Sequence, residues 1–226
     1  MKKRRLKRVS MKTKAVLIVL LIPVAVVVFT LSTIVLASIY NTDFIRKSAS
    51  TLIELQDRQG ATHIPEEYIP IYKEAADAYG IPWTLLAAHH RIETRFSTMD
   101  TLISPAGAEG HMQFMPCTFV GWSYPGCTGG LGKGDIPESE KTDLAIIEKH
   151  GGYGVDGNGD GIADPFNIED AVHSAAKYLA SSGAADGNYE KAIFNYNRSD
   201  KYVKDVLYFF NEFEAVREQS ETLVEK

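Results

Sequence analysis

The stretch that decides the fold of this chain is Ser104-Pro-Ala-Gly-Ala-Glu-Gly-His-Met-Gln-Phe-Met-Pro116. It follows a segment, Pro82–Phe96, that is predicted to be a helix with a proline in its first turn, where a helix accepts one. A third segment, Tyr196-Asn197, lies far downstream. The order of these three segments carries most of what the sequence says about fold and function.

The expected helix 82–96 carries Glu93, which is the candidate general acid. Helical spacing places Glu93 on a face with Leu86, His89 and Phe96. Apolar and aromatic neighbours remove water from a carboxylate and raise its pKa, as a general acid working near neutral pH requires. The alternative is a solvated Glu93 that pairs with a nearby cation such as Arg95.

Taken together, the three segments resemble the lytic transglycosylases, which share the fold of goose-type lysozyme. The match runs over about residues 64–210 and is closest to the membrane-bound B-type branch, whose members carry a calcium loop. The resemblance implies a mainly α, lysozyme-like domain. Four departures from the family pattern are visible: Thr94, His111, the pair Arg198-Ser199, and an extra stretch at 117–150.

The resemblance implies cleavage of the MurNAc-GlcNAc β-1,4 glycosidic bond of peptidoglycan, with Glu93 as general acid and base. A lytic transglycosylase would leave 1,6-anhydroMurNAc ends. Entry of water would instead make the enzyme a muramidase, and a domain that grips glycan strands without cutting them is a further alternative. No second acid is placed opposite Glu93, although ordinary glycosidases use two carboxyl groups.

The resemblance also assigns substrate contacts by position. Ser104 and Gln113 would bond the sugar substituents and hold Glu93, Met112 and Phe114 would pack under the glycan, Tyr196 would orient Glu93, and Asn197 would bind substrate. Phe114 can equally be a plain core residue. Gly107 and Gly110 can serve only to allow close backbone packing.

The run Asp156-Gly-Asn158-Gly-Asp160-Gly-Ile162 has the spacing of a calcium loop, with oxygen ligands at every second residue and glycine at the sixth position. A standard loop would end with a carboxylate at 167, where this chain has asparagine. In the B-type family the closing carboxylate is the fifteenth residue, here Asp170. The expected ligands of a structural Ca²⁺ are Asp156, Asn158, Asp160, the Ile162 carbonyl and Asp170. The alternatives are a turn cluster without metal, and a helix-cap role for Asp170.

The chain contains two cysteines, Cys117 and Cys127. An exported domain permits a disulfide between them, and two free thiols are the alternative.

The N-terminus predicts export. Eight Lys and Arg residues within 1–14 precede an uncharged stretch at 15–40 that is long enough to span a bilayer. The expected arrangement is a single-pass anchor with the catalytic domain on the cell-wall side, and a cleaved signal peptide is the alternative. Beyond residue 14 the chain has 16 basic and 29 acidic residues, a formal charge of −13. Such an acidic domain argues against nucleic-acid binding.

These observations divide the chain into a basic head (1–14), an anchor (15–40), a stalk (41–63), a catalytic domain (64–213) and a charged tail (214–226). Further helices are expected over 65–79, 112–122, 142–150, 168–182, 189–197 and 201–213. Gly80 is expected to end the first of them and Asn167 to cap the fourth.

Overall fold

The computed structural model describes residues 26–33, 37 and 63–224. Contacts divide the chain into two units, residues 1–60 and 61–226. The basic head, most of the anchor and nearly all of the stalk lie outside the described residues. Within the described ranges, no helix combines the length and apolar character needed to cross a membrane.

The second unit is mainly α-helical, and its first helices form one side of the core. A short 3₁₀ turn, η1 (Glu66–Tyr68), leads into α3 (Ile69–Tyr79) and then α4 (Trp83–Thr94). Gly80 ends α3 in a left-handed conformation with φ of 66°, which confirms the predicted C-cap. The side chains of Leu85 and Leu86 on α4 are fully buried.

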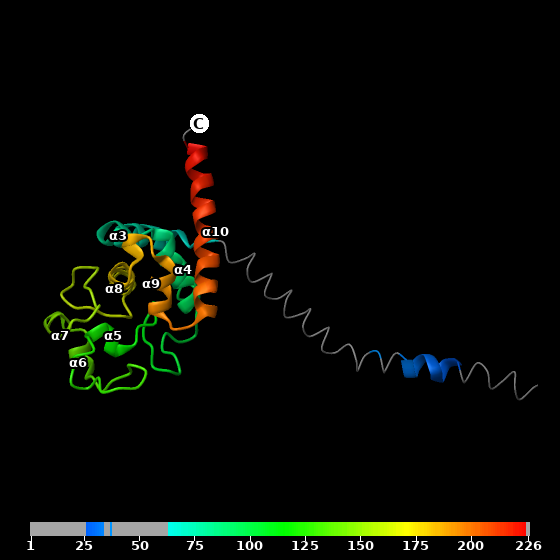
Figure 1. Cartoon of the computed structure of the whole chain (residues 1–226), viewed down its shortest axis with the longest axis horizontal. Helices are drawn as coiled ribbons and strands as arrows, with labels where there is room; N and C mark the ends of the chain where they lie inside the picture. Colours follow the sequence, from blue (N-terminus) through cyan, green and yellow to red (C-terminus); the bar gives the residue numbers. More distant parts are fainter. Residues whose placement is uncertain (1–25, 34–36, 38–62, 225–226) are drawn as a thin grey trace, which may run out of the picture. The chain divides into compact units, whose positions relative to one another are not determined.

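The C-terminal helices complete the core around α4. Helix α8 (Ile168–Ser181) packs on α3, and α10 (Asp200–Val224) packs along α4 (Figure 1). Asn167 caps α8 by accepting a hydrogen bond from the Asp170 backbone N–H, as predicted. Helix α9 (Tyr189–Tyr196) follows a 3₁₀ turn, η2 (Ala184–Asp186), and contacts both α8 and α10.

The helix expected over 201–213 is longer than predicted, because α10 continues to Val224 through most of the charged segment that begins at 214. Thr84 on α4 donates a hydrogen bond to Glu214, and Arg217 pairs with the same carboxylate. The bond from Thr84 ties the middle of α10 to α4, and the ion pair with Arg217 within α10 holds the Glu214 carboxylate. The charge that suggested a tail belongs to a helix with one packed face.

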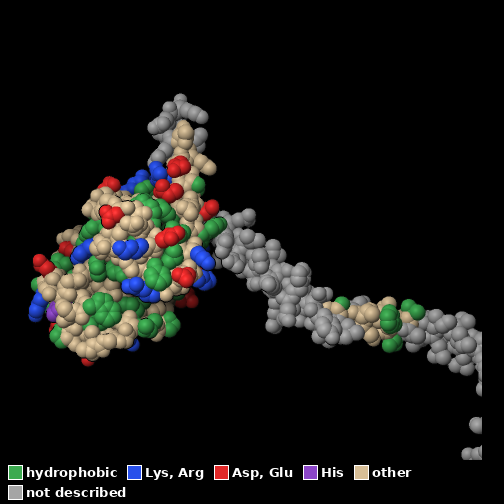
Figure 2. Space-filling view, in the orientation of Figure 1, with side chains coloured by type: hydrophobic (Ala, Val, Ile, Leu, Met, Phe, Trp, Pro, Cys, Tyr) green, Lys and Arg blue, Asp and Glu red, His purple; other side chains and the backbone are tan. Residues whose placement is uncertain are grey.

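The segment between α4 and α8 is mostly irregular and holds three short helices: α5 (Pro116–Val120), α6 (Glu138–Lys141) and α7 (Leu144–His150). Cys117 and Cys127 are joined by a disulfide bond. Lys141 donates to Glu109 at 2.7 Å and fastens α6 to the loop before α5. Side chains of both charge signs are interspersed with hydrophobic ones on the face seen in Figure 2.

Two glycines of the Ser104–Pro116 run are required by the backbone. Gly107 and Gly110 have φ of 90° and 79°, which other residues rarely adopt. A Cβ atom at Gly110 would lie 1.8 Å from the Pro165 carbonyl oxygen, so this turn and the segment before α8 touch backbone to backbone. Part of the motif therefore serves packing between two loops, whatever the substrate is.

Candidate functional site

The candidate site centres on Glu93 in the last turn of α4. Its side chain is partly exposed, and its Oε1 atom accepts a 2.5 Å hydrogen bond from the hydroxyl of Tyr202 on α10. Burial of the surroundings raises the pKa of Glu93 to about 7, while the bond from Tyr202 opposes the rise because it favours the carboxylate. Glu93 therefore holds and releases a proton near neutral pH.

Tyr202 is a residue that the sequence analysis missed. The orienting role was expected of Tyr196, but the Tyr196 hydroxyl donates to the Met112 carbonyl oxygen at 2.7 Å. Tyr196 nevertheless lies close enough for the charge of Glu93 to raise its pKa, after the larger effect of burial. Nothing in local spacing pointed to Tyr202, because its contact with Glu93 joins residues 109 positions apart.

His89 closes the floor of the site one helical turn before Glu93. Its ring centroid lies 5.1 Å from that of Tyr196 and 6.1 Å from that of Tyr202. Burial lowers the pKa of His89 to about 4, so the ring is neutral. Its Nδ1 atom bonds the Leu85 carbonyl oxygen and is therefore protonated, while Nε2 is buried and has no hydrogen-bond partner among the described residues. Because the His89 ring is neutral, it supplies no positive charge that would stabilise the carboxylate form of Glu93.

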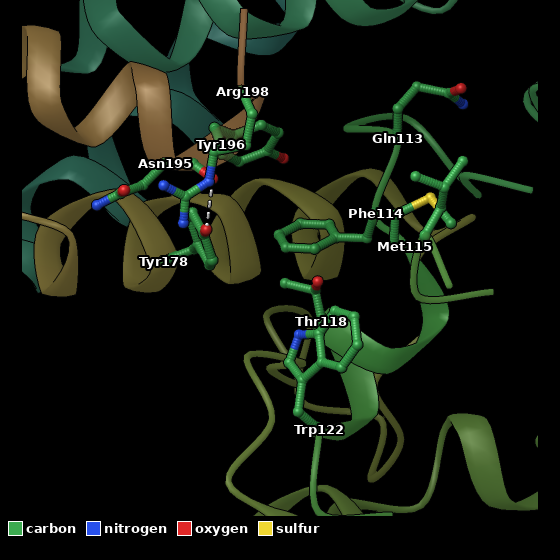
Figure 3. Close-up of a pocket in the computed structure, with 10 residues that line it drawn as sticks. Gln113, Phe114, Met115, Thr118, Trp122, Tyr178, Asn195, Tyr196 and Arg198 are labelled. Carbon is green, nitrogen blue, oxygen red and sulfur yellow. Dashed lines mark hydrogen bonds between the residues drawn. The ribbon is translucent and has the colours of Figure 1, made fainter. Parts of the chain in front are cut away.

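A groove of about 340 Å³ opens beside this centre, and Figure 3 shows its two walls. One wall comes from α8, α9 and the residues after α9: Tyr178, Asn195, Tyr196 and Arg198. The other comes from the 113–131 region: Gln113, Phe114, Met115, Thr118, Trp122 and Leu131. Glu93 does not line this groove, but Tyr196 belongs both to the groove and to the surroundings of Glu93.

Of the six expected substrate contacts, Gln113, Phe114 and Tyr196 line the groove. Gln113 has φ of 51°, and its side-chain nitrogen donates to the carbonyl oxygens of Leu102 and Gly110, so it also holds the turn in place.

The other three residues are placed differently. Met112 is fully buried, and only its carbonyl reaches the site, through Tyr196. Ser104 accepts a hydrogen bond from the Ala108 backbone N–H and stabilises a turn, while its expected bond to Glu93 is not found. Asn197 is an exposed residue that ends α9, and Asn195 lines the groove in its place.

A hydrogen-bonded chain begins on α4 at His90, three residues before Glu93. The rings of His90 and His111 flank the Ser97 hydroxyl at 2.6 Å each, Tyr72 bonds His90 Nδ1 at 2.6 Å, and His111 Nε2 bonds the Phe166 carbonyl oxygen at 2.9 Å.

The Phe166 carbonyl oxygen, at one end of the chain, determines which atom carries the proton in each hydrogen bond. His111 Nε2 must donate to the Phe166 oxygen, so a neutral His111 accepts at Nδ1 from Ser97. Ser97 then accepts from His90 Nε2–H, and Tyr72 donates to His90 Nδ1. Burial, the largest cause in both cases, lowers the pKa of His90 to about 3 and that of His111 below its usual value, so both rings are neutral.

The predicted calcium loop is compact and closed by Asp170. The Asp170 carboxylate accepts the backbone N–H groups of Gly157, Asn158 and Asp164, and Asp156 accepts those of Gly159, Asp160 and Gly161. Burial raises the pKa of Asp170 above its usual value. Across the described ranges, no three His, Cys, Asp or Glu side chains gather as a metal cluster. The loop nevertheless fits calcium chemistry in its donor set, which consists of carboxylate, amide and carbonyl oxygens.

Comparison with known proteins gives one informative match. The chain is 31% identical over 146 residues to the L-Ala–D-Glu endopeptidase of Bacillus subtilis (strain 168), and this alignment covers 64% of the chain and 41% of that protein. The chain thus spans less than half the length of this relative. No family model matches the chain, and no solved structure matches it.

This comparison contradicts the resemblance to lytic transglycosylases and the function drawn from it. The relative is named an endopeptidase for an L-Ala–D-Glu bond, whereas the sequence analysis predicted cleavage of the MurNAc-GlcNAc bond by a transglycosylase or muramidase. The error has a physical source. The Ser104–Pro116 run fixes turns and loop packing around Gly110, and such a motif reports on scaffold geometry more than on the bond that is cut.

Proposed function

We propose that residues 61–226 form a peptidoglycan hydrolase that acts on the peptide stem, with Glu93 as its acid–base group. The observation that carries the proposal is a partly exposed carboxyl group beside a groove, with its pKa raised to about 7. The named activity of the B. subtilis relative supports the choice of the stem and of its L-Ala–D-Glu bond.

The proposed reaction uses both protonation states of Glu93. As a carboxylate, Glu93 takes a proton from water while the water oxygen attacks the L-Ala carbonyl carbon. As an acid, it gives that proton to the amide nitrogen while the C–N bond breaks. The products are an L-Ala carboxyl group and a D-Glu amine, and Glu93 returns to its starting state. No thiol nucleophile competes for this role, because both cysteines of the chain are in the disulfide.

Digestion of purified peptidoglycan by the full chain, its Glu93→Gln variant and a matched Glu190→Gln control tests the proposal. Glu190 is exposed on α9 and outside the groove. We expect new D-Glu amino ends from the wild type and the control, and loss by a factor of about 10² or more in Glu93→Gln, the usual contribution of a general acid or base.

Two results would contradict the proposal in different ways. Full activity of Glu93→Gln would remove Glu93 from the chemistry. New sugar ends without new amino ends would show that the stem is not the part of the polymer that is cut.

We also propose that the 156–170 loop binds one structural Ca²⁺ through Asp156, Asn158, Asp160, the Ile162 carbonyl and Asp170. The all-oxygen donor set and the closure of the loop by Asp170 support this. At a Ca²⁺ concentration a hundredfold above Kd, binding would stabilise the fold by about 2.7 kcal/mol. Thermal unfolding with Ca²⁺ or chelator should show this shift in the wild type and in an Asp186→Ala control, and no shift in Asp156→Ala.

We propose that the chain is exported and that residues 15–40 anchor it, on the basis of the charge and apolar pattern alone. The test is protease treatment of intact cells from which the wall has been removed. Digestion of the 61–226 unit from outside, with residues 15–40 kept in the membrane fraction, is the expected result. Recovery of an intact unit would contradict export.

A further inference from the structure

The groove contains one charged side chain, that of Arg198. Arg198 is exposed, its guanidinium lies over the Phe194 ring at 5.7 Å, and none of the described carboxylates forms an ion pair with it. Figure 3 shows it on the same wall as Tyr178 and Tyr196. The chain beyond residue 14 has a formal charge of −13. A single unpaired cation in the groove of an acidic domain is therefore a local site of attraction for an anion.

The opposite wall offers an apolar surface held in place. Trp122 and Leu131 are 52% and 77% exposed, and both line the groove. A Cβ atom at Gly132 would lie 3.0 Å from the Trp122 ring, so the indole rests on the backbone of its own loop. The disulfide between Cys117 and Cys127 closes the segment that carries Trp122.

The two walls of the groove together indicate which kind of ligand can bind there. A glutamate inside a peptide uses one of its two carboxyl groups in the chain and keeps the other free. A stem peptide that contains L-Ala–D-Glu therefore presents one planar carboxylate beside apolar atoms. Guanidinium matches a carboxylate through two parallel hydrogen bonds, and an aromatic face takes the apolar part. Neutral sugar rings would use the aromatic wall but would bring no carboxylate to Arg198.

Resting on the proposed function, we propose that Arg198 is the specificity residue that binds the free carboxylate of D-Glu in the stem peptide, with Trp122 packing against the adjacent apolar atoms. Arg198 follows the Tyr196-Asn197 pair directly in the chain, so the bound carboxylate lies within a few residues of the wall that Tyr196 shares with the Glu93 site. Amidation of that carboxyl group would then decide whether a stem is a good substrate.

A binding experiment that needs no catalysis tests this proposal. The probe is a short L-Ala–D-Glu peptide with blocked ends and one free carboxyl group, compared with the same peptide amidated at that group. Binding to the full chain in a Glu93→Gln background is followed by NMR through the Trp122 indole signal, which a Trp122→Phe variant assigns against Trp83.

We expect the free-carboxyl peptide to bind about fivefold more tightly than the amide, a modest value because Arg198 is solvent-exposed. Arg198→Gln should bring the ratio to about one, and Arg198→Lys should keep part of it because lysine retains the charge without the fork. Lys191→Gln, an exposed cation on α9 outside the groove, should leave the ratio unchanged.

A ratio of one in the Glu93→Gln parent, a ratio that survives Arg198→Gln, or no binding of either peptide would each overturn the proposal. These outcomes are separate from the digestion of peptidoglycan. Release of D-Glu amino ends by an enzyme with a ratio of one would leave the hydrolase function standing and remove Arg198 from recognition.

Discussion

At the scale of a single residue, the carboxyl group of Glu93 exchanges its proton near pH 7, and its desolvation lowers the stability of the folded chain. Burial raises its pKa from 4.5 to about 7, so the folded chain holds this proton more firmly than the unfolded chain does. The contribution of Glu93 to stability is therefore greatest below pH 4.5, falls as the pH rises to about 7, and falls no further above it. A neutral amide at this position would avoid the cost of the buried charge.

We therefore predict that Glu93→Gln raises the melting temperature at pH 8 and changes it little at pH 4. The reason is that glutamine mimics the protonated acid, which is the form already present at low pH. Thermal unfolding of both proteins at the two pH values measures this, with Glu190→Gln as an exposed control. An equal difference at pH 4 and pH 8 would show that Glu93 is not desolvated as described.

The bond from Tyr202 is predicted to set the pH at which Glu93 works. Loss of a hydrogen bond to a charged group, about 1.5 kcal/mol, corresponds to a rise in pKa of about one unit. Tyr202→Phe should thus move the acidic limb of the pH profile of kcat/KM upward by up to that amount. Tyr196→Phe is the matched control, because its hydroxyl bonds the Met112 carbonyl oxygen and not Glu93. An unmoved limb in Tyr202→Phe would reduce Tyr202 to a packing role.

At the scale of an element, the end of α4 is held by the hydrogen-bonded chain through Ser97. The helix ends in three consecutive residues with positive φ, Arg95, Phe96 and Ser97, and such backbone costs free energy unless the surroundings enforce it. Ser97 enforces it by joining His90 on α4 to His111 in the turn that meets the segment before α8. The position of Glu93, four residues before Ser97, depends on this clamp.

Loss of the Ser97 hydroxyl, at the centre of the hydrogen-bonded chain, is predicted to destabilise the fold more than loss of the Tyr72 hydroxyl at its end. Ser97→Ala leaves both His90 Nε2–H and His111 Nδ1 without a partner, and should cost about 2–4 kcal/mol at 1–3 kcal/mol for each unsatisfied buried group, less what water recovers. Tyr72→Phe leaves one acceptor unpaired and should cost about 1–2 kcal/mol by the same reasoning. Urea unfolding measures both. A smaller loss for Ser97→Ala than for Tyr72→Phe would contradict the central place of Ser97 in the hydrogen-bonded chain.

At the scale of the whole molecule, local sequence signals predicted most of the helices but not the contacts between them. Gly80 and Asn167 marked helix ends correctly, because a C-cap glycine and an N-cap asparagine act within one turn. The helix expected over 142–150 is present as α7, whereas α6 was not predicted, because it follows a stretch whose Gly and Pro content favours loops. The continuation of α10 to Val224 was missed because charge pattern says nothing of the contact between Thr84 and Glu214.

The same difference between local sequence signals and helix packing applies to the candidate site. Glu93 was predicted from its position on the helix, and burial does raise its pKa. Tyr202 was not, because that contact depends on how α10 crosses α4. The substrate was predicted wrongly for a related reason. Gly107 and Gly110 satisfy a backbone requirement of the scaffold, and the side chain that we propose to select the ligand, Arg198, stands at one of the departures from the family pattern.

The last prediction concerns the disulfide as the link between fold and groove. Cys117 and Cys127 are separated by 10 residues, and closing a loop of that size in the unfolded chain is worth about 3 kcal/mol by chain entropy. Reduction should therefore lower the free energy of unfolding by about that amount.

Because Trp122 lies inside this loop, reduction should also weaken binding of the L-Ala–D-Glu peptide while Glu93 keeps its pKa. Urea unfolding and the indole titration, each with and without reductant, measure the two effects, and a Cys117→Ser/Cys127→Ser chain that no longer responds to reductant is the control. Unchanged peptide binding after reduction would mean that the apolar wall is held by Gly132 and its neighbours rather than by the covalent bond.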